Sequence, residues 1–214
     1  MAVKIKSGQT ILFIGDSITD CGRRGPEAPL GNGYVKQFTD LVTIREPGKK
    51  IRVINKGIGG DVVTGLRDRW EDDVLRRRPD WLSVKIGIND LHRVLRQNPD
   101  PVPPALYMEA YDDILSRTRK ALPKCRLLLI EPFYMSRARS ESSFRRRVLD
   151  FIPKYIAVVE AMSRKYRTRL VKTHAIFQRL LKDHEPDKFG MEPVHPNLTG
   201  HLAIAEAVYA ALSR

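Results

Sequence analysis

Four short motifs contain residues whose types could together perform an acyl transfer. Ser17, in "GDSITD" (15–20), offers a hydroxyl, and "NKGIGGD" (55–61) offers backbone N–H groups from its glycines. Asn89, in "GIND", offers a side-chain amide, and His195, in "VHPN", offers an imidazole. Acyl transfer requires a nucleophile, a base that takes its proton, and donors for the negative oxygen of the tetrahedral intermediate.

Each motif taken alone also has a purely structural explanation. Ser17 could be the N-cap of a turn, Asn89 a turn former, and His195 a structural histidine before a helix. The glycines could form a flexible turn, and they match neither a P-loop nor the dinucleotide-binding spacing. Only the positions of the four motifs relative to the strands can therefore favour the catalytic interpretation over the structural one.

Short apolar runs alternate along the chain with helical stretches. This alternation predicts an α/β fold with one open, mostly parallel sheet and helices on both faces. No repeat, low-complexity stretch or linker divides the chain, so we expect one domain over residues 1–214. The expected strands cover 10–15, 51–55, 81–87, 126–131 and 169–173; the expected helices cover 33–44, 63–78, 104–122, 142–166 and 198–212, with Pro153 kinking or splitting the fourth.

The first three motifs follow the first three expected strands, and the histidine precedes the last expected helix. Ligands of such folds bind beyond the carboxyl ends of the strands. We therefore expect the hydroxyl, the backbone donors, the amide and the imidazole to meet at one edge of the sheet.

The composition limits the partners of the chain. The formal net charge of +13 could indicate a polyanion partner, but no nucleic-acid-binding signature accompanies the basic clusters, so a solvated basic surface is the simpler interpretation. No apolar run approaches the roughly 20 residues of a membrane span, and the N-terminal run lacks the features of a signal peptide, so the expected compartment is the cytoplasm. Cys21 and Cys125 indicate neither a disulfide framework nor a zinc site.

Together the motifs resemble those of the SGNH, or GDSL, hydrolase family, and the resemblance spans nearly the whole chain. The stretches "LFIGDSITDCGR", "NKGIGGD", "PDWLSVKIGINDLHR" and "HPNLTGH" are similar to the acetylxylan-esterase branch of bacterial SGNH enzymes. The resemblance implies a three-layer flavodoxin-like fold with about five parallel strands. It also implies Ser17 as nucleophile, His195 as base, and the Ser17 and Gly60 N–H groups with the Asn89 amide as oxyanion donors.

The resemblance further implies a serine esterase that acts on short-chain esters, with acetylated carbohydrates as the leading substrate and with no metal or organic cofactor. A broad-specificity lipase or arylesterase of the same family and a weakly catalytic polyanion-binding module are the alternatives. Binding to a membrane or to specific nucleic acid is not expected, and a homo-oligomer is compatible with the sequence. The charged segment 132–150 could form a lid, an interface or a loop over the site.

The residue three positions before His195 departs from the family, which has an aspartate where this chain has Glu192. Pro193 favours a β-turn over "EPVH", which would bring the first and fourth residues within reach of each other. We therefore expect Glu192 to orient the imidazole. A backbone carbonyl or Asp187 is the alternative partner of His195.

Other polar residues near the motifs are expected to have structural roles. Asp16 and Asp90 should brace their turns, and His201 should be a packed or hydrogen-bonded histidine. His92 and Trp70 could line the pocket, although ordinary packing is the simpler interpretation.

Overall fold

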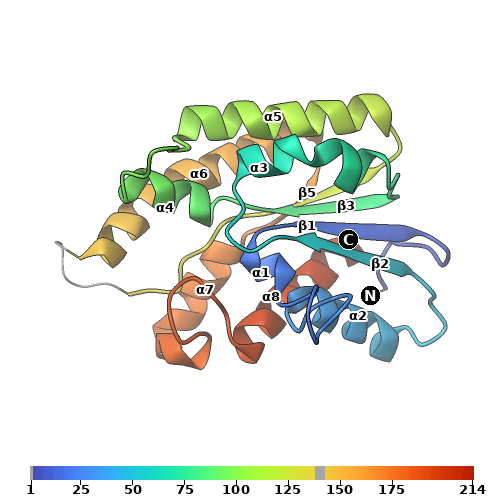
Figure 1. Cartoon of the computed structure of the whole chain (residues 1–214). Coiled ribbons are helices and arrows are strands. Elements are labelled where there is room, and N and C mark those ends of the chain that lie inside the picture. Colours follow the sequence, from blue (N-terminus) through green and yellow to red (C-terminus); the bar gives the residue numbers. More distant parts are fainter. Residues whose placement is uncertain (1, 138–142) are drawn as a thin grey trace.

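The computed structural model of the chain describes residues 2–137 and 143–214. Its centre is a parallel five-stranded sheet with the order β2-β1-β3-β4-β5 (Figure 1). The first strand, β1, lies inside the sheet; β2 then forms one edge beside it, and β3, β4 and β5 follow in order on its other side. The strands are β1 (Thr10–Gly15), β2 (Arg52–Gly57), β3 (Trp81–Lys85), β4 (Arg126–Ile130) and β5 (Arg169–Val171).

Helices cover both faces of this sheet, as the sequence predicts (Figure 1). One face carries α3 (Val63–Asp68), α5 (Pro104–Ala121) and α6 (Phe144–Tyr166); the other carries α1 (Ser17–Asp20), α2 (Tyr34–Arg45), α7 (Thr173–Asp183) and α8 (Leu198–Ser213). A further helix, α4 (Ile88–Leu95), follows β3 directly. The central strands are buried on both faces, which explains their nearly continuous apolar sequences.

Two expected helices differ in the structure. The helix expected over 63–78 is divided into α3 and a short π-helical turn, η1 (Glu71–Leu75). Between them Trp70 is fully buried and donates from Nε1 to Thr118 Oγ1 at 2.9 Å, so this point of the chain is anchored in the layer. Helix α6 runs through Pro153 without division, so of the two expected outcomes, a kink or a split, the split does not occur.

Besides the one-turn helix α1, two longer helices were not predicted. Helix α7 carries buried Phe177 and Leu181 one turn apart, which is an amphipathic signal that the sequence contains. Helix α4 starts inside the "GIND" motif at a glycine with φ of 131°, where the sequence indicates only a turn. In the segment 132–150, residues 138–142 lie outside the described residues, so the proposed lid is not described there.

Candidate active site

The ends of the central strands align the first three motifs at one edge of the sheet. In the strand register, Gly15 of β1 pairs with Gly57 of β2 and with Lys85 of β3. Ser17, the glycine turn and Asn89 each follow these residues within a few positions. The predicted meeting of the motifs at the carboxyl ends of the strands therefore results from the register itself.

The turn that presents Ser17 depends on close packing at Gly15. A Cβ atom added at Gly15 would lie 2.1 Å from the Lys85 carbonyl oxygen, so no other residue fits there. The N-cap of α1 is Asp16, not Ser17: its Oδ1 accepts from the Ile18 N–H at 3.0 Å. The Ser17 hydroxyl is thus not used in capping the helix.

Ser17, His195 and Glu192 form a continuous hydrogen-bonded chain. The Ser17 Oγ lies 2.8 Å from His195 Nε2, and His195 Nδ1 lies 2.5 Å from Glu192 Oε1. A carboxylate only accepts hydrogen bonds, so Nδ1 carries the proton and Nε2 is left with a lone pair toward Ser17. His195 is 57% exposed, so a ligand can reach this end of the chain of contacts.

The Glu192 carboxylate also builds the turn that carries His195. Its Oε1 accepts from the His195 backbone N–H at 2.6 Å, and its Oε2 accepts from the Val194 N–H at 2.9 Å. Backbone hydrogen bonds therefore hold both carboxylate oxygens in place, in addition to the contact of Oε1 with the imidazole. Asp187, the alternative partner, contributes its backbone carbonyl to Asn197 Nδ2 at 3.3 Å, and no bond joins its carboxylate to His195.

The three candidate oxyanion donors, in Ser17, Gly60 and Asn89, follow the carboxyl ends of β1, β2 and β3. Gly60 has φ of +78°, and the space where its Cβ would stand is open. Among the described residues, none accepts a hydrogen bond from the N–H of Gly60 or of Ser17. Asn89 donates one amide hydrogen from Nδ2 to the Asp61 carbonyl at 2.9 Å, which leaves its second amide hydrogen available.

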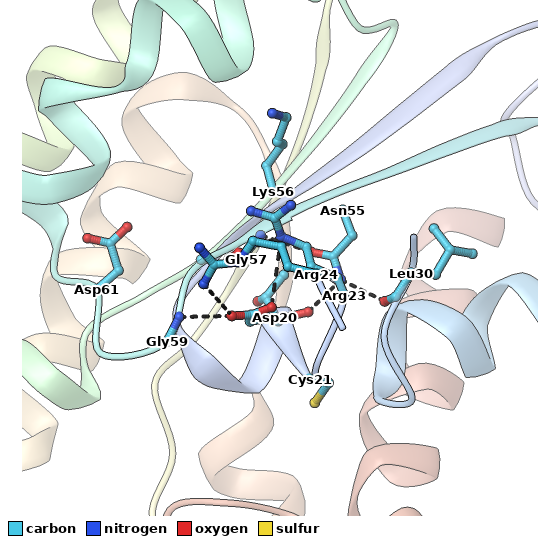
Figure 2. Close-up of polar contacts among 12 residues, drawn as sticks. Asp20, Cys21, Arg23, Arg24, Leu30, Asn55, Lys56, Gly57, Gly59 and Asp61 are labelled. Carbon is cyan, nitrogen blue, oxygen red and sulfur yellow. Dashed lines mark hydrogen bonds and ion pairs between the residues drawn. The ribbon is translucent and has the colours of Figure 1, made fainter. Parts of the chain in front are cut away.

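A polar network that the sequence analysis missed holds the glycine turn against α1 (Figure 2). Asp20 Oδ2 accepts from the Gly59 N–H at 3.1 Å, and Arg23 Nε donates to the Gly57 carbonyl at 2.6 Å. Asn55 Nδ2 donates to the Thr19 carbonyl at 2.6 Å. These contacts join residues about 35 to 40 positions apart, so no local sequence pattern predicts them.

A buried ion pair lies directly behind the nucleophile. Asp16 and Lys85 are both 0% exposed, and Lys85 Nζ lies 3.2 Å from Asp16 Oδ2. Burial lowers the pKa of Lys85, and the neighbouring Asp16 opposes this shift. Removing one partner of such a pair typically costs about 3–5 kcal/mol, because the other charge stays buried and unpaired. Asp16 therefore braces its turn as expected, with a partner that the sequence did not reveal.

Asp90 braces a second turn from inside the protein. It is fully buried, its Oδ1 accepts from the Val63 N–H at 2.9 Å, and its Oδ2 has no partner among the described residues. Burial, with a smaller contribution from the charge of Asp16, raises the pKa of Asp90 from 3.8 to about 7.

The raised pKa of Asp90 gives stability a defined pH dependence. Between about pH 4 and 7 the folded protein keeps a proton that the unfolded chain has lost, so this group lowers the free energy of unfolding as pH rises. Asp90→Asn removes this titration. In urea unfolding at a series of pH values, the free energy of unfolding of the variant should rise relative to that of the parent, by up to about 1.4 kcal/mol per pH unit across this window. A difference independent of pH would contradict the assignment.

The remaining residues near the motifs have structural contacts. His201 is 5% exposed, its Nδ1 accepts from the Tyr34 N–H at 3.2 Å, and its Nε2 lies 3.2 Å from Cys21 Sγ. The expectation of a hydrogen-bonded structural histidine is confirmed. Burial raises the pKa of Cys21 to about 12 and that of Cys125 similarly, so neither thiol is activated.

Trp70 and His92, which could line the pocket, differ in how deeply they are buried. Trp70 is packed in the core, as described above. His92 is partly buried, and burial together with the charge of Arg96 lowers its pKa to about 4. Its ring packs against those of Tyr134 and Phe144, with ring centres 6.1 Å and 5.5 Å apart. In the described parts of the chain, no cluster of three His, Cys, Asp or Glu side chains could hold a metal ion, and no helix could cross a membrane.

Comparison with known proteins gives consistent matches over nearly the whole chain. Residues 13–203 match the model of the GDSL-like lipase/acylhydrolase family. The chain is 38% identical to an acetylxylan esterase of Geobacillus stearothermophilus over 96% of its length and 94% of that protein. It is 26% identical to an uncharacterised protein of Bacillus subtilis (strain 168), covering 99% of this chain and 84% of that one.

Solved structures agree with these matches. A crystal structure of the Geobacillus acetylxylan esterase superposes with a TM-score of 0.87 at 35% identity, covering 99% of this chain and 97% of that one. An alpha/beta hydrolase from the metagenome of Lake Arreo, Spain, superposes with a TM-score of 0.86 at 28% identity, covering 97% and 96%. Catalytic mutants of the Geobacillus enzyme have also been solved, with a serine, a histidine or an aspartate replaced by alanine.

Proposed function

The chain belongs to the GDSL-like lipase/acylhydrolase family and is a carboxylic ester hydrolase, and from this premise we propose that it deacetylates acetylated xylo-oligosaccharides through an acyl-enzyme on Ser17. The observation that carries the proposal is the continuous chain from Ser17 Oγ through His195 to Glu192, at 2.8 Å and 2.5 Å. The substrate class rests on the likeness to the Geobacillus enzyme.

The reaction follows from the protonation state of these residues. His195 Nε2 takes the proton of Ser17 as Oγ attacks the ester carbonyl, and the Glu192 carboxylate stabilises the imidazolium. The N–H groups of Ser17 and Gly60 and the Asn89 amide receive the negative oxygen. His195 then protonates the leaving alcohol. Water, activated by the same imidazole, releases the acid and restores Ser17.

A substrate panel tests this function. The protein should hydrolyse acetylated xylo-oligosaccharides with higher kcat/KM than aryl acetates or long-chain lipid esters. Comparable rates on aryl acetates would favour a broad arylesterase, and higher rates on long-chain esters would favour a lipase. Hydrolysis of none of them, together with tight and salt-sensitive heparin binding, would instead indicate a polyanion-binding module.

Asn89→Ala should lower turnover by about 100-fold to 1000-fold, as expected for loss of one oxyanion donor. The donor acts on charge that develops only in the transition state, so kcat should fall much more than KM changes. Because the Asn89 amide also holds the Asp61 carbonyl at 2.9 Å, unfolding should be measured alongside the kinetics. A folded variant with turnover near the parent level would remove Asn89 from the mechanism.

A further inference from the structure

The side chain of Arg69 ties together the ends of β1 and β2, which lead into two of the four motifs. Arg69 lies between α3 and η1. Its Nη2 donates to the Gly15 carbonyl at 3.3 Å, and its Nη1 donates to the Lys56 carbonyl at 2.8 Å. Gly15 ends β1 two positions before Ser17, and Lys56 is the next-to-last residue of β2. One guanidinium group therefore holds the ends of two neighbouring strands.

The same guanidinium group uses all of its donors within the protein. Nε and Nη2 of Arg69 donate to Asp61 Oδ2 at 2.9 Å and 2.7 Å, and Nη1 also donates to Asp73 Oδ2 at 2.7 Å. Together with the bonds to the two carbonyls, these bonds use the five N–H groups that an arginine offers. The side chain is 16% exposed. Arg69 can therefore orient its neighbours, but it has no donor left for a substrate.

The contact with Arg69 fixes the side chain of Asp61, the residue that follows Gly60. The other carboxylate oxygen of Asp61, Oδ1, accepts from the Val62 N–H at 3.0 Å. This oxygen also fills the space beside Gly65, where an added Cβ would lie 2.1 Å from it. Asp61 is 11% exposed in its side chain, and both of its oxygens have partners. Its position is therefore defined, and half of the bonding that defines it comes from Arg69.

The backbone of Asp61 in turn orients the Asn89 amide. The Asp61 carbonyl accepts from Asn89 Nδ2 at 2.9 Å. The two hydrogens of an amide NH₂ group lie in one plane at a fixed angle, so a carbonyl that holds one of them determines where the other points. The position of Asp61 thus sets the direction of the second Asn89 N–H, which the proposed mechanism uses for the oxyanion.

Gly60, the neighbouring oxyanion donor, stands between two anchored residues. On one side the Gly59 N–H donates to Asp20 Oδ2 at 3.1 Å (Figure 2). On the other side the Asp61 N–H donates to the Ile58 carbonyl at 3.2 Å. Gly60 itself has φ of +78°, a conformation that glycine adopts without steric cost. The direction of its N–H therefore depends on how firmly these neighbours are held.

We propose that Arg69 is a positioning residue for the oxyanion donors, and that it acts through Asp61 on the direction of the Asn89 amide. This inference rests on the proposed function and adds a residue that does not touch the substrate. A misplacement of about 1 Å can cost on the order of 100-fold in rate. Because the oxyanion develops only in the transition state, loss of this positioning lowers kcat and leaves KM little changed.

Arg69→Lys tests the assignment, because lysine keeps the charge but offers three donors at one point instead of five in a plane. We expect kcat for acetyl ester hydrolysis to fall at least about tenfold, with KM within about threefold of the parent. Asp61→Ala removes the same contact and keeps the backbone carbonyl, so it should give the same separation of kcat from KM. Urea unfolding of each variant shows that it is folded under the conditions of the assay.

A double variant distinguishes positioning from general support of the fold. If Arg69 acts through Asn89, Arg69→Lys has little left to disturb in an Asn89→Ala background, and kcat should fall by less than about a further threefold. Independent effects would multiply instead. A further loss as large as that of the single variant would therefore overturn the proposal.

Arg117→Lys is the matched control, because Arg117 also contacts a backbone carbonyl and two carboxylates, which belong to Arg67, Asp113 and Glu71. It belongs to α5, which contributes no residue to the four motifs, and the variant should keep kcat within about twofold. An equal loss of kcat in this control would overturn the specific role of Arg69.

The outcomes also separate this inference from the function on which it rests. Parental kcat in Arg69→Lys and Asp61→Ala, beside a strong loss in Asn89→Ala, would overturn the positioning role alone. Parental kcat in Asn89→Ala would overturn the oxyanion assignment, and a parent protein without acetyl esterase activity would overturn the proposed function itself.

Discussion

Ser17→Ala is expected to lower kcat for acetyl ester hydrolysis on the order of 10⁶-fold, to the level left by binding and oxyanion stabilisation alone. The physical reason is that the variant has no atom that can form the acyl-enzyme. Among the described residues, the one side-chain hydrogen bond that the variant loses is the 2.8 Å bond to His195. Steady-state hydrolysis of a chromogenic acetate measures the loss.

The same variant separates catalysis from folding. The Ser17 side chain does not cap α1, because Asp16 does, so the free energy of unfolding should change by less than about 0.5 kcal/mol. A fluorophosphonate probe should label Ser17 in the parent and leave the variant unlabelled. Substantial turnover by the folded variant would show that another group is the nucleophile.

The placement of the site could be predicted from the sequence because parallel sheets concentrate strand ends. Gly15, Gly57 and Lys85 end neighbouring strands in one register row, so residues that follow them in sequence must meet in space. The turn over Glu192 and His195 could be predicted as well, since both residues and Pro193 are local. Such predictions need only short-range rules.

The ion pair and the hydrogen bonds that hold the site's turns in place could not be predicted, because their partners are far apart in the sequence. Lys85 stands in an apolar strand, and only the fold shows that it neutralises Asp16, 69 positions away. Likewise, no local pattern indicates that Asp20 binds the Gly59 N–H. The continuous helix expected over 63–78 is divided into α3 and η1, and Trp70 between them binds Thr118, 48 positions away, a partner that no local pattern indicates.

Glu192→Ala is expected to lower kcat by about 10²-fold to 10⁴-fold with little change in KM, as for loss of the acid in other triads. Without the carboxylate, nothing fixes the proton on Nδ1, so Nε2 is not held ready to accept the proton of Ser17. The variant also frees the backbone N–H groups of Val194 and His195, which Glu192 binds at 2.9 Å and 2.6 Å.

Glu192→Gln separates these two effects, because an amide oxygen can still accept from the backbone while its NH₂ group can favour the wrong tautomer of His195. We expect Glu192→Gln to lose at least about 100-fold in kcat while its free energy of unfolding stays closer to the parent than that of the alanine variant. Asp187→Ala is the matched control and should keep turnover within about twofold. A loss below about fivefold in both Glu192 variants would mean that Ser17 and His195 work as a dyad, and that the glutamate serves the turn alone.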